Sequence, residues 1–208
     1  LLKKRSEEKI KTLMKELHHR VKNNLQVLSD LLSLQSARLA EGTAKEAVKA
    51  GEDRVNAMAL IHRDIYLSDE LQDIDMPVYI SKLVRNLMTS YGYTEQQIEL
   101  RLDSDPLMLD VDKAIPLGLI VNELVSNAFK YAFDGNSDPV LTINLNKDDS
   151  KIILKVADNG AGIPEGKELN TSSFGLRLVQ MLTRQLQGNI ETFTKSGMSY
   201  QLQFSLGR

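Results

Sequence analysis

The chain lacks several features that would place it in common classes of protein. It contains no cysteine, so it has no disulfide, no thiol nucleophile and no metal site built on thiolates. No apolar run approaches the roughly 18 residues of a membrane-spanning helix, and no signal peptide is recognisable. The formal net charge of −2 gives no general electrostatic case for nucleic acid as a partner. The first residue is leucine rather than methionine, so we expect a fragment of a longer protein.

Two long helices are predicted at the N-terminal end. Apolar residues recur mostly in steps of three and four, so one helix with a single apolar seam should span about residues 6–40. The turn falls at residues 41–43, and a second helix should span about residues 44–67. A short loop makes long helices antiparallel neighbours, which predicts an all-α hairpin over residues 1–67, two copies of which should pair into a four-helix bundle. The expected seam residues are Met14, Leu17, Val21, Leu25, Leu28, Leu32 and Leu39 on the first helix, and Val48, Val55, Met58, Ile61, His62, Ile65 and Tyr66 on the second.

The three histidines differ in their position on these helices. At about 100° per residue, His19 points away from the apolar seam, whereas His18 lies near the edge of the seam. His62 lies on the apolar side of the second helix, so we interpret it as a core histidine. Glu16 and Asn23 share the polar face of His19. A solvated helix face explains this segment taken alone, but an imidazole held in the open on a rigid helix also suits chemistry on another molecule.

The second half of the chain is predicted to mix helices and strands. Residues 68–77 form a polar, acidic linker, and Pro77 should start a helix that ends near Tyr91. Short β-rich segments bounded by turn residues predict five strands in the part that follows. The expected strands are Ile98–Leu102, Val140–Asn146, Lys151–Ala157, Asn189–Thr194 and Ser199–Ser205.

A helix around residues 122–131 carries polar side chains of types that bind metal and phosphate. Glu123, Asn127, Lys130 and Tyr131 lie three and four residues apart, so they can converge on one site. Asn127 and Glu123 offer hard oxygen atoms, which suit Mg²⁺. Lys130 offers a point charge for a phosphate.

Closely spaced glycines follow this helix along the chain. Asp158 with Gly160 and Gly162 gives a fixed carboxylate beside backbone that a flat ligand can approach. Gly175 and Leu176 open the next helix, where backbone N–H groups can bind a phosphate. Each signal alone is weak, because Asp-Asn-Gly is also ordinary turn chemistry. The ordered set of Asn/Lys helix, strand, Asp-Gly turn and Gly-initiated helix is a much stronger signal.

This set resembles the core of a two-component sensor histidine kinase. From about Lys11 to the C-terminus, the chain resembles the subfamily whose phosphoacceptor box reads H-H-R-V-K-N-N-L-Q, which is related to the HWE kinases. The resemblance implies a dimerisation and histidine phosphotransfer hairpin over residues 1–67. Over residues 78–208 it implies an ATP-binding domain of the GHKL (Bergerat) type, an α+β two-layer sandwich. In that domain it places Asn127 in the N box, Asp158, Gly160 and Gly162 in the G1 box, and Gly175 in the G2 box.

The resemblance also implies a mechanism with ATP and Mg²⁺. Its phosphoacceptor directly precedes an arginine and stands four residues before an asparagine, which selects His19. Adenine would lie against Asp158, with phosphates and Mg²⁺ near Asn127, Lys130 and the Gly175 helix start, and the phosphoryl group would pass from His19 to an aspartate of a response regulator. Only 12 residues separate Gly162 from Gly175, so we expect a short lid, an open site and low nucleotide affinity in the isolated domain.

The general base is left open by the resemblance. Many histidine kinases carry an acidic residue directly after the acceptor, where this chain has Arg20. Glu16, one turn before His19, and Glu123 are the two candidates, and simple solvation explains Glu16 equally well. Asn23 occupies the place from which relatives orient a water for phosphatase action.

The implied partners are a response regulator receiver domain and a second copy of the chain. We further expect a cytoplasmic fragment whose upstream sensor domain or membrane anchor is missing. Two other classes stay open: a degenerate scaffold or phosphotransfer protein, and a GHKL ATPase or Ser/Thr kinase with Glu123 as base. Intact Asn127, Asp158 and Gly175 argue against the first class, and His19 on a long helix argues against the second.

Overall fold

The computed structural model describes residues 17, 21, 23–26, 28–29, 32, 39, 42–67, 73–163, 173–194 and 196–206, with the backbone alone for residues 62–67. The chain divides into two compact units, Leu1–Ile74 and Asp75–Arg208. No helix within the described residues is both long enough and apolar enough to cross a membrane.

The first unit contains two helical segments that run side by side. The described residues from 17 to 32 are helical, and α2 spans Thr43–Leu67. Ser29 Oγ donates to Asn56 Oδ1 at 2.7 Å, and a Cβ on Gly51 would lie 3.8 Å from Leu32 Cδ1. From Ser29 to Leu32 on the first segment, the neighbouring residue on α2 goes back from Asn56 to Gly51. The two segments are therefore antiparallel, as the predicted hairpin requires. Gly42 adopts φ +138° at the turn, a conformation that favours glycine.

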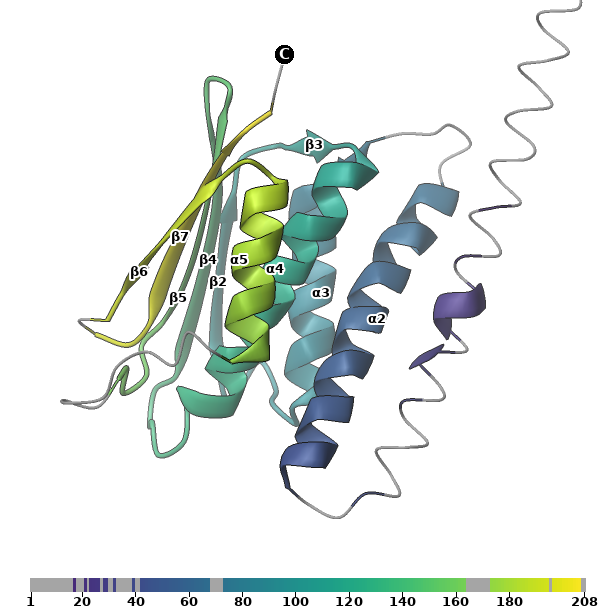
Figure 1. Ribbon diagram of the computed structural model, residues 1–208. Coiled ribbons are helices and arrows are strands. Elements are labelled where there is room, and N and C mark those ends of the chain that lie inside the picture. Colours follow the sequence, from purple (N-terminus) through teal and green to yellow (C-terminus); the bar gives the residue numbers. More distant parts are fainter. Residues whose placement is uncertain are drawn as a thin grey trace, which may run out of the picture. The chain divides into compact units, whose positions relative to one another are not determined.

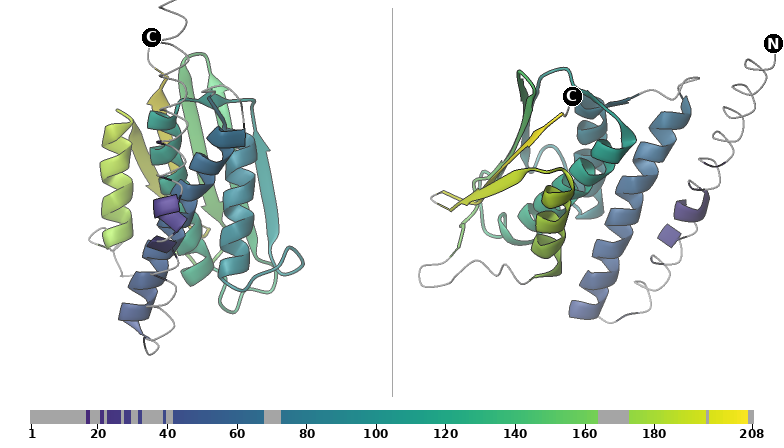
Figure 2. Two further views of the ribbon diagram at one scale, coloured as in Figure 1. Left: turned by 90° about the vertical axis from the view of Figure 1, so that its right-hand side faces the viewer. Right: turned by 45° about the horizontal axis from the view of Figure 1, so that its top comes forward.

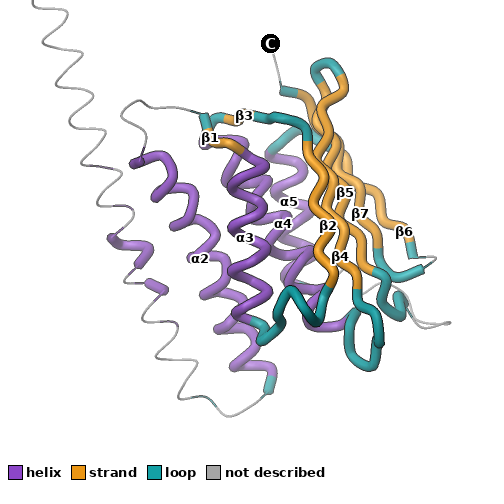
Figure 3. Tube along the Cα trace, turned by 180° about the vertical axis from the view of Figure 1, so that it is seen from behind, coloured by secondary structure: helices purple, strands orange, loops and turns teal. Residues whose placement is uncertain are grey.

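The second unit is a five-stranded sheet covered on one face by three helices. The strand order is β2-β4-β5-β7-β6; β2 runs parallel to β4, and the other neighbours are antiparallel. The three helices lie on the same face of the sheet in every view (Figure 1, Figure 2 and Figure 3). This is the predicted two-layer α+β sandwich. The elements are α3 (Met76–Ser90), β2 (Glu99–Ser104), α4 (Val111–Tyr131), β4 (Val140–Asp148), β5 (Lys151–Asp158), α5 (Phe174–Gln185), β6 (Asn189–Phe193) and β7 (Ser199–Ser205).

Alternating side chains explain why the sheet is covered on one face only. Successive residues of a strand point to opposite faces, so every second residue can join the core. The core residues from the three central strands are aliphatic or aromatic, whereas Lys155 between them is exposed. All five predicted strands are present, with ends that differ from the prediction by at most two residues. The buried residues are Leu141, Ile143 and Leu145 of β4, Ile152, Leu154 and Val156 of β5, and Tyr200, Leu202 and Phe204 of β7.

The end of the predicted linker is structured. The strands β1 (Ile74–Asp75) and β3 (Met108–Leu109), which were not predicted, form a two-stranded sheet, and α3 begins at Met76, one residue before Pro77. Ile74 and Met76 are buried, so this acidic stretch contributes to the core. The Asp75 side chain caps α3 by accepting from Val78 N at 3.1 Å. Two alternating apolar residues within a polar stretch were too short a pattern for the sequence to show as a strand.

The helix that carries the expected metal and phosphate ligands begins before residue 122, where the polar side chains of the predicted site start. Helix α4 begins at Val111, after Asp110, which accepts from Lys113 N at 3.0 Å. Pro116 lies inside α4, where proline removes one backbone hydrogen bond. A Cβ on Gly118 would lie 2.6 Å from Tyr79 Cε1, so only glycine lets α3 and α4 approach this closely. This packing orients the part of α4 that reaches the candidate site.

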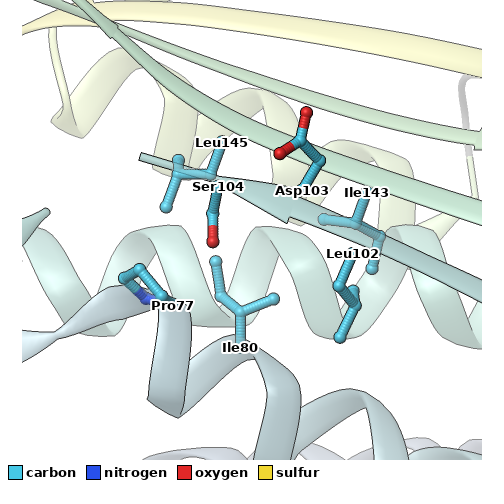
Figure 4. Close-up of a pocket in the computed structure, with 7 residues that line it drawn as sticks. All are labelled: Pro77, Ile80, Leu102, Asp103, Ser104, Ile143 and Leu145. Carbon is cyan, nitrogen blue, oxygen red and sulfur yellow. The ribbon is translucent and has the colours of Figure 1, made fainter. Parts of the chain in front are cut away.

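A small pocket opens between α3 and the β2 side of the sheet (Figure 4). None of the residues expected in the nucleotide site lines it. Asp103 points away from the apolar side chains in Figure 4. The pocket is lined by Pro77, Ile80, Leu102, Asp103, Ser104, Ile143 and Leu145.

Candidate nucleotide site

A carboxylate held by backbone N–H groups lies at the end of β5. Asp158 Oδ1 accepts from Gly160 N at 2.9 Å and from Met198 N at 3.2 Å. Burial raises the pKa of the Asp158 carboxyl, and the two backbone hydrogen bonds oppose that shift. Both bonds go to Oδ1, and within the described residues Oδ2 accepts no hydrogen bond. The structure therefore fixes the carboxylate through Oδ1, while Oδ2 has no hydrogen-bond partner in the part of the chain that the structure describes.

Two glycines allow close packing around the Asp158 turn, Gly160 against Ala132 and Gly197 against Asp158. A Cβ on Gly160 would lie 2.6 Å from the Ala132 Cα, at the end of α4. Gly197 has φ +86°, and a Cβ there would lie 2.9 Å from Asp158 Oδ1. Gly160 was predicted as a site residue, but Gly197 was missed. The available signal was a glycine two residues before β7, the strand that pairs with the strand of Asp158.

Asn159 joins the Asp-Gly turn to the loop that follows α4. Its Nδ2 donates to the Asp138 carbonyl at 2.8 Å, and its Oδ1 accepts from Val140 N at 2.8 Å. Asn136 Nδ2 also donates to Asn159 Oδ1, at 3.1 Å. The sequence indicated only a turn residue here, because a short-range pattern does not reveal bonds to residues about 20 positions away. These bonds fix the start of β4 beside the carboxylate turn.

Glu123 of α4 faces the start of α5. Glu123 is buried, and its Oε2 lies 2.7 Å from the position that a Cβ on Gly175 would occupy. Asn122 Nδ2 donates to Glu123 Oε1 at 3.2 Å. Asn127 is half-buried one turn further along the same face of α4. The structure thus brings Glu123 and the predicted phosphate-binding helix start together, although they are far apart in the sequence.

Lys130 and Tyr131, the other two residues of the predicted polar set, lie at the C-terminal end of α4. Lys130 Nζ is 5.7 Å from the centroid of the Tyr91 ring, a cation–π distance. Tyr131 is 72% exposed. Of the four side chains predicted to converge, Glu123 is buried beside Gly175, Asn127 is half-buried, and Tyr131 remains at the surface.

The start of α5 is a capped helix N-terminus. Ser173 is the N-cap, and its Oγ accepts from Leu176 N at 3.4 Å. The Leu176 N–H is thus already bonded, and the first turn of α5 presents the positive end of the helix dipole. Gly175 opens this turn, as predicted. The segment of residues 164–172 lies outside the described residues, so the short lid remains a prediction.

Most of the predicted phosphotransfer residues lie outside the described part of the chain. This applies to His18, His19 and Glu16. Asn23 is described, and it is helical and exposed. The side chain of His62 is likewise outside the described residues.

Comparison with known families covers both units. Residues 16–91 match the family described as histidine kinase. Residues 112–208 match the family of histidine kinase-, DNA gyrase B- and HSP90-like ATPases. The chain belongs to the histidine kinases. Within the second unit, residues 112–208 form a domain of the ATPase class that the resemblance implied.

Several sensor histidine kinases are similar to this one along most of its length. The sensor histidine kinase PdtaS of Mycobacterium tuberculosis is 32% identical over 180 residues, covering 85% of this chain and 36% of PdtaS. Blue-light-activated histidine kinase 2 of Erythrobacter litoralis is 24% identical over 186 residues, covering 88% of this chain and 53% of that protein. The chain therefore spans between about a third and about half of these curated relatives.

A solved structure shares the fold. The histidine kinase domain of the Erythrobacter litoralis EL346 blue-light activated histidine kinase superposes with a TM-score of 0.69. The match covers 95% of this chain and 94% of that domain at 19% sequence identity. At this identity the similarity shows the fold alone.

Proposed function

We propose that this histidine kinase core transfers the γ-phosphoryl group of ATP to His19 and then to an aspartate of a response regulator. The observation that carries the nucleotide half of the proposal is the Asp158 carboxylate, which is fixed through Oδ1 and keeps Oδ2 for a ligand. A carboxylate oxygen accepts from the exocyclic amine of adenine, and the glycine backbone of the turn admits a flat base. The residues present therefore fit an adenine nucleotide.

The phosphate end of the nucleotide would lie between α4 and the start of α5. Glu123 and Asn127 supply the carboxylate and amide oxygens that Mg²⁺ prefers. Bound Mg²⁺ would neutralise phosphate charge during transfer. The first turn of α5 offers a positive helix end, and Lys130 offers a cation within reach of the same helix face. The contact between Glu123 and Gly175 supports this placement.

Transfer requires a neutral His19 imidazole to meet the γ-phosphoryl group in line. The task of the protein is mainly positioning and charge neutralisation. Glu123, which lies at the proposed phosphate end, would orient Mg²⁺ or polarise the imidazole, and Glu16 on the face of His19 is the alternative base. Asn23, one turn beyond His19 and exposed, would orient a water for phosphatase action on the phosphorylated regulator.

Incubation with γ-labelled ATP and Mg²⁺ tests this proposal. The parent chain should acquire acid-labile label, because phosphohistidine hydrolyses in acid. His19→Gln should abolish the label while ADP binding stays at the parent level, since the nucleotide binds in the other unit. His18→Gln is the matched control and should retain most of the label. Loss of label in a folded His18→Gln chain that binds ADP normally would show that the wrong histidine was chosen.

The same experiment separates the two alternative classes. A scaffold that no longer uses ATP would bind no nucleotide and take up no label. A Ser/Thr-directed kinase would give label that survives acid. Either result would contradict the proposed histidine phosphotransfer.

A further inference from the structure

Tyr200 on β7 is a neighbour of Asp158 on β5. The strand register pairs Val156 with Tyr200, and Asp158 N donates to the Met198 carbonyl at 2.9 Å. The strands β5 and β7 lie side by side (Figure 1). Their register makes Asp158 and Tyr200 diagonal neighbours, within reach of an aromatic side chain. Because side chains alternate along a strand, Asp158, Val156 and Tyr200 all project toward the helices. Tyr200 is only 7% exposed.

The Tyr200 hydroxyl is a hydrogen-bond donor with no acceptor among the described residues. Burial, and secondly the Asp158 carboxylate, raise the pKa of Tyr200 to about 12, so the phenol stays protonated at neutral pH. The hydroxyl forms no hydrogen bond with the described part of the chain. A protonated phenol thus lies beside a carboxylate that has one oxygen left for a ligand.

An adjacent acceptor and donor match one edge of adenine. Adenine presents the N6 amine as a donor and, next to it, ring atom N1 as an acceptor. Guanine and hypoxanthine present the reverse at the same edge, an O6 acceptor beside an N1–H donor. A carboxylate beside a phenol O–H is complementary to the first pattern and mismatched to the second.

We propose that Tyr200 is a specificity-determining residue of the nucleotide site, whose O–H donates a hydrogen bond to adenine N1 while Asp158 Oδ2 accepts from the N6 amine. The inference rests on the proposed nucleotide site and adds a second contact to the base. A base with the reversed pattern leaves polar groups unpaired in a closed pocket, and such mismatches discriminate strongly between ligands. Tyr200 therefore selects adenine over the 6-oxopurines.

The test compares ADP with 1-deaza-ADP, in which a C–H replaces N1 and the N6 amine is kept. Calorimetry on the whole chain with Mg²⁺ should show the parent binding ADP about fivefold more tightly than 1-deaza-ADP, the typical value of one neutral hydrogen bond. Tyr200→Phe keeps the ring and removes the hydroxyl, so it should bind the two ligands equally. Tyr93→Phe is the matched control, because the Tyr93 hydroxyl donates to the Phe129 carbonyl at 3.3 Å, and it should retain the parent preference.

Each outcome bears on a separate claim. Equal binding of ADP and 1-deaza-ADP by the parent, or an undiminished preference for ADP in Tyr200→Phe, would overturn the role of Tyr200 and leave the nucleotide site standing. A parent chain that binds neither ligand at millimolar concentration would overturn the proposed function and, with it, this inference.

Discussion

The Glu123 carboxylate on α4 lies against Gly175 at the start of α5, with Oε2 2.7 Å from the position of an added Cβ. A contact this short leaves no room for any other residue at position 175 unless the carboxylate moves. The same carboxylate accepts from Asn122 Nδ2, so its position is held from both sides. The packing of α4 against α5 at this point therefore depends on the absence of a side chain at Gly175.

Gly175→Ala should displace Glu123 and slow phosphotransfer. A misplacement of about 1 Å in a catalytic site can lower the rate by roughly 100-fold, so we expect a reduction of 10- to 100-fold in the initial rate of labelling. Gly51→Ala in α2 is the control, since its Cβ would make only an ordinary contact of 3.8 Å with Leu32. Unchanged labelling in a folded Gly175→Ala chain would show that this contact has no part in the reaction.

Asp158→Asn should weaken the binding of adenine nucleotides. The substitution replaces a carboxylate acceptor with an amide, and a charge-assisted hydrogen bond contributes about 1.5–3 kcal/mol. Titration with ADP should therefore show a Kd that is about 10- to 100-fold higher. Asp103→Asn, at an exposed position of β2, is the control with the same change of charge. Equal ADP affinity in parent and Asp158→Asn would remove the basis for the adenine pocket.

Asp158→Asn should also make the folded state more stable, although it weakens nucleotide binding. Burial raises the folded-state pKa of Asp158 above its ordinary value of 3.8, so ionised Asp158 makes the folded state less stable at neutral pH. Asp158→Asn should then raise the free energy of unfolding at pH 7. That advantage should shrink as the pH falls through the raised pKa and vanish below 3.8, where both states are protonated. Urea unfolding of both chains at pH 7 and at pH 3.5 measures the difference, and a parent that is the more stable of the two at pH 7 would contradict this account.

Leu28→Asp should disrupt self-association of the hairpin. Leu28 is 49% exposed and Leu17 is 54% exposed in the single chain, although both belong to the apolar seam. We expect a second copy to cover them, and burying an unpaired carboxylate there is costly. Gln26→Asp adds the same charge at an exposed polar position and should be tolerated. Light scattering should give a dimer for the parent and for Gln26→Asp, and a monomer for Leu28→Asp. A parent chain that is monomeric at high micromolar concentration would rule out the four-helix bundle.

The sequence predicted local features well where a repeating pattern or a special residue carried them. The alternation in Val140–Asp148 and Lys151–Asp158 showed two strands, because a half-buried strand requires a period of two. Gly175 marked the start of α5, and the order of Asn127, Asp158 and Gly175 indicated the nucleotide-binding family. In contrast, β1 and β3 are two residues each, too short to leave a pattern.

The order of the longer helices and strands was therefore predicted from the sequence alone, because periodicity and turn chemistry are local properties. The two-layer architecture and the proposed role of Asp158 in binding the base came from the resemblance to a known family. Only the tertiary structure decided which distant groups meet that carboxylate. Met198 N donates to it from 40 residues away, and Gly197 and Tyr200 reach it through the register between β5 and β7. A shift of one residue in that register would turn Tyr200 to the opposite face of the sheet, and the packing of the whole core sets the register.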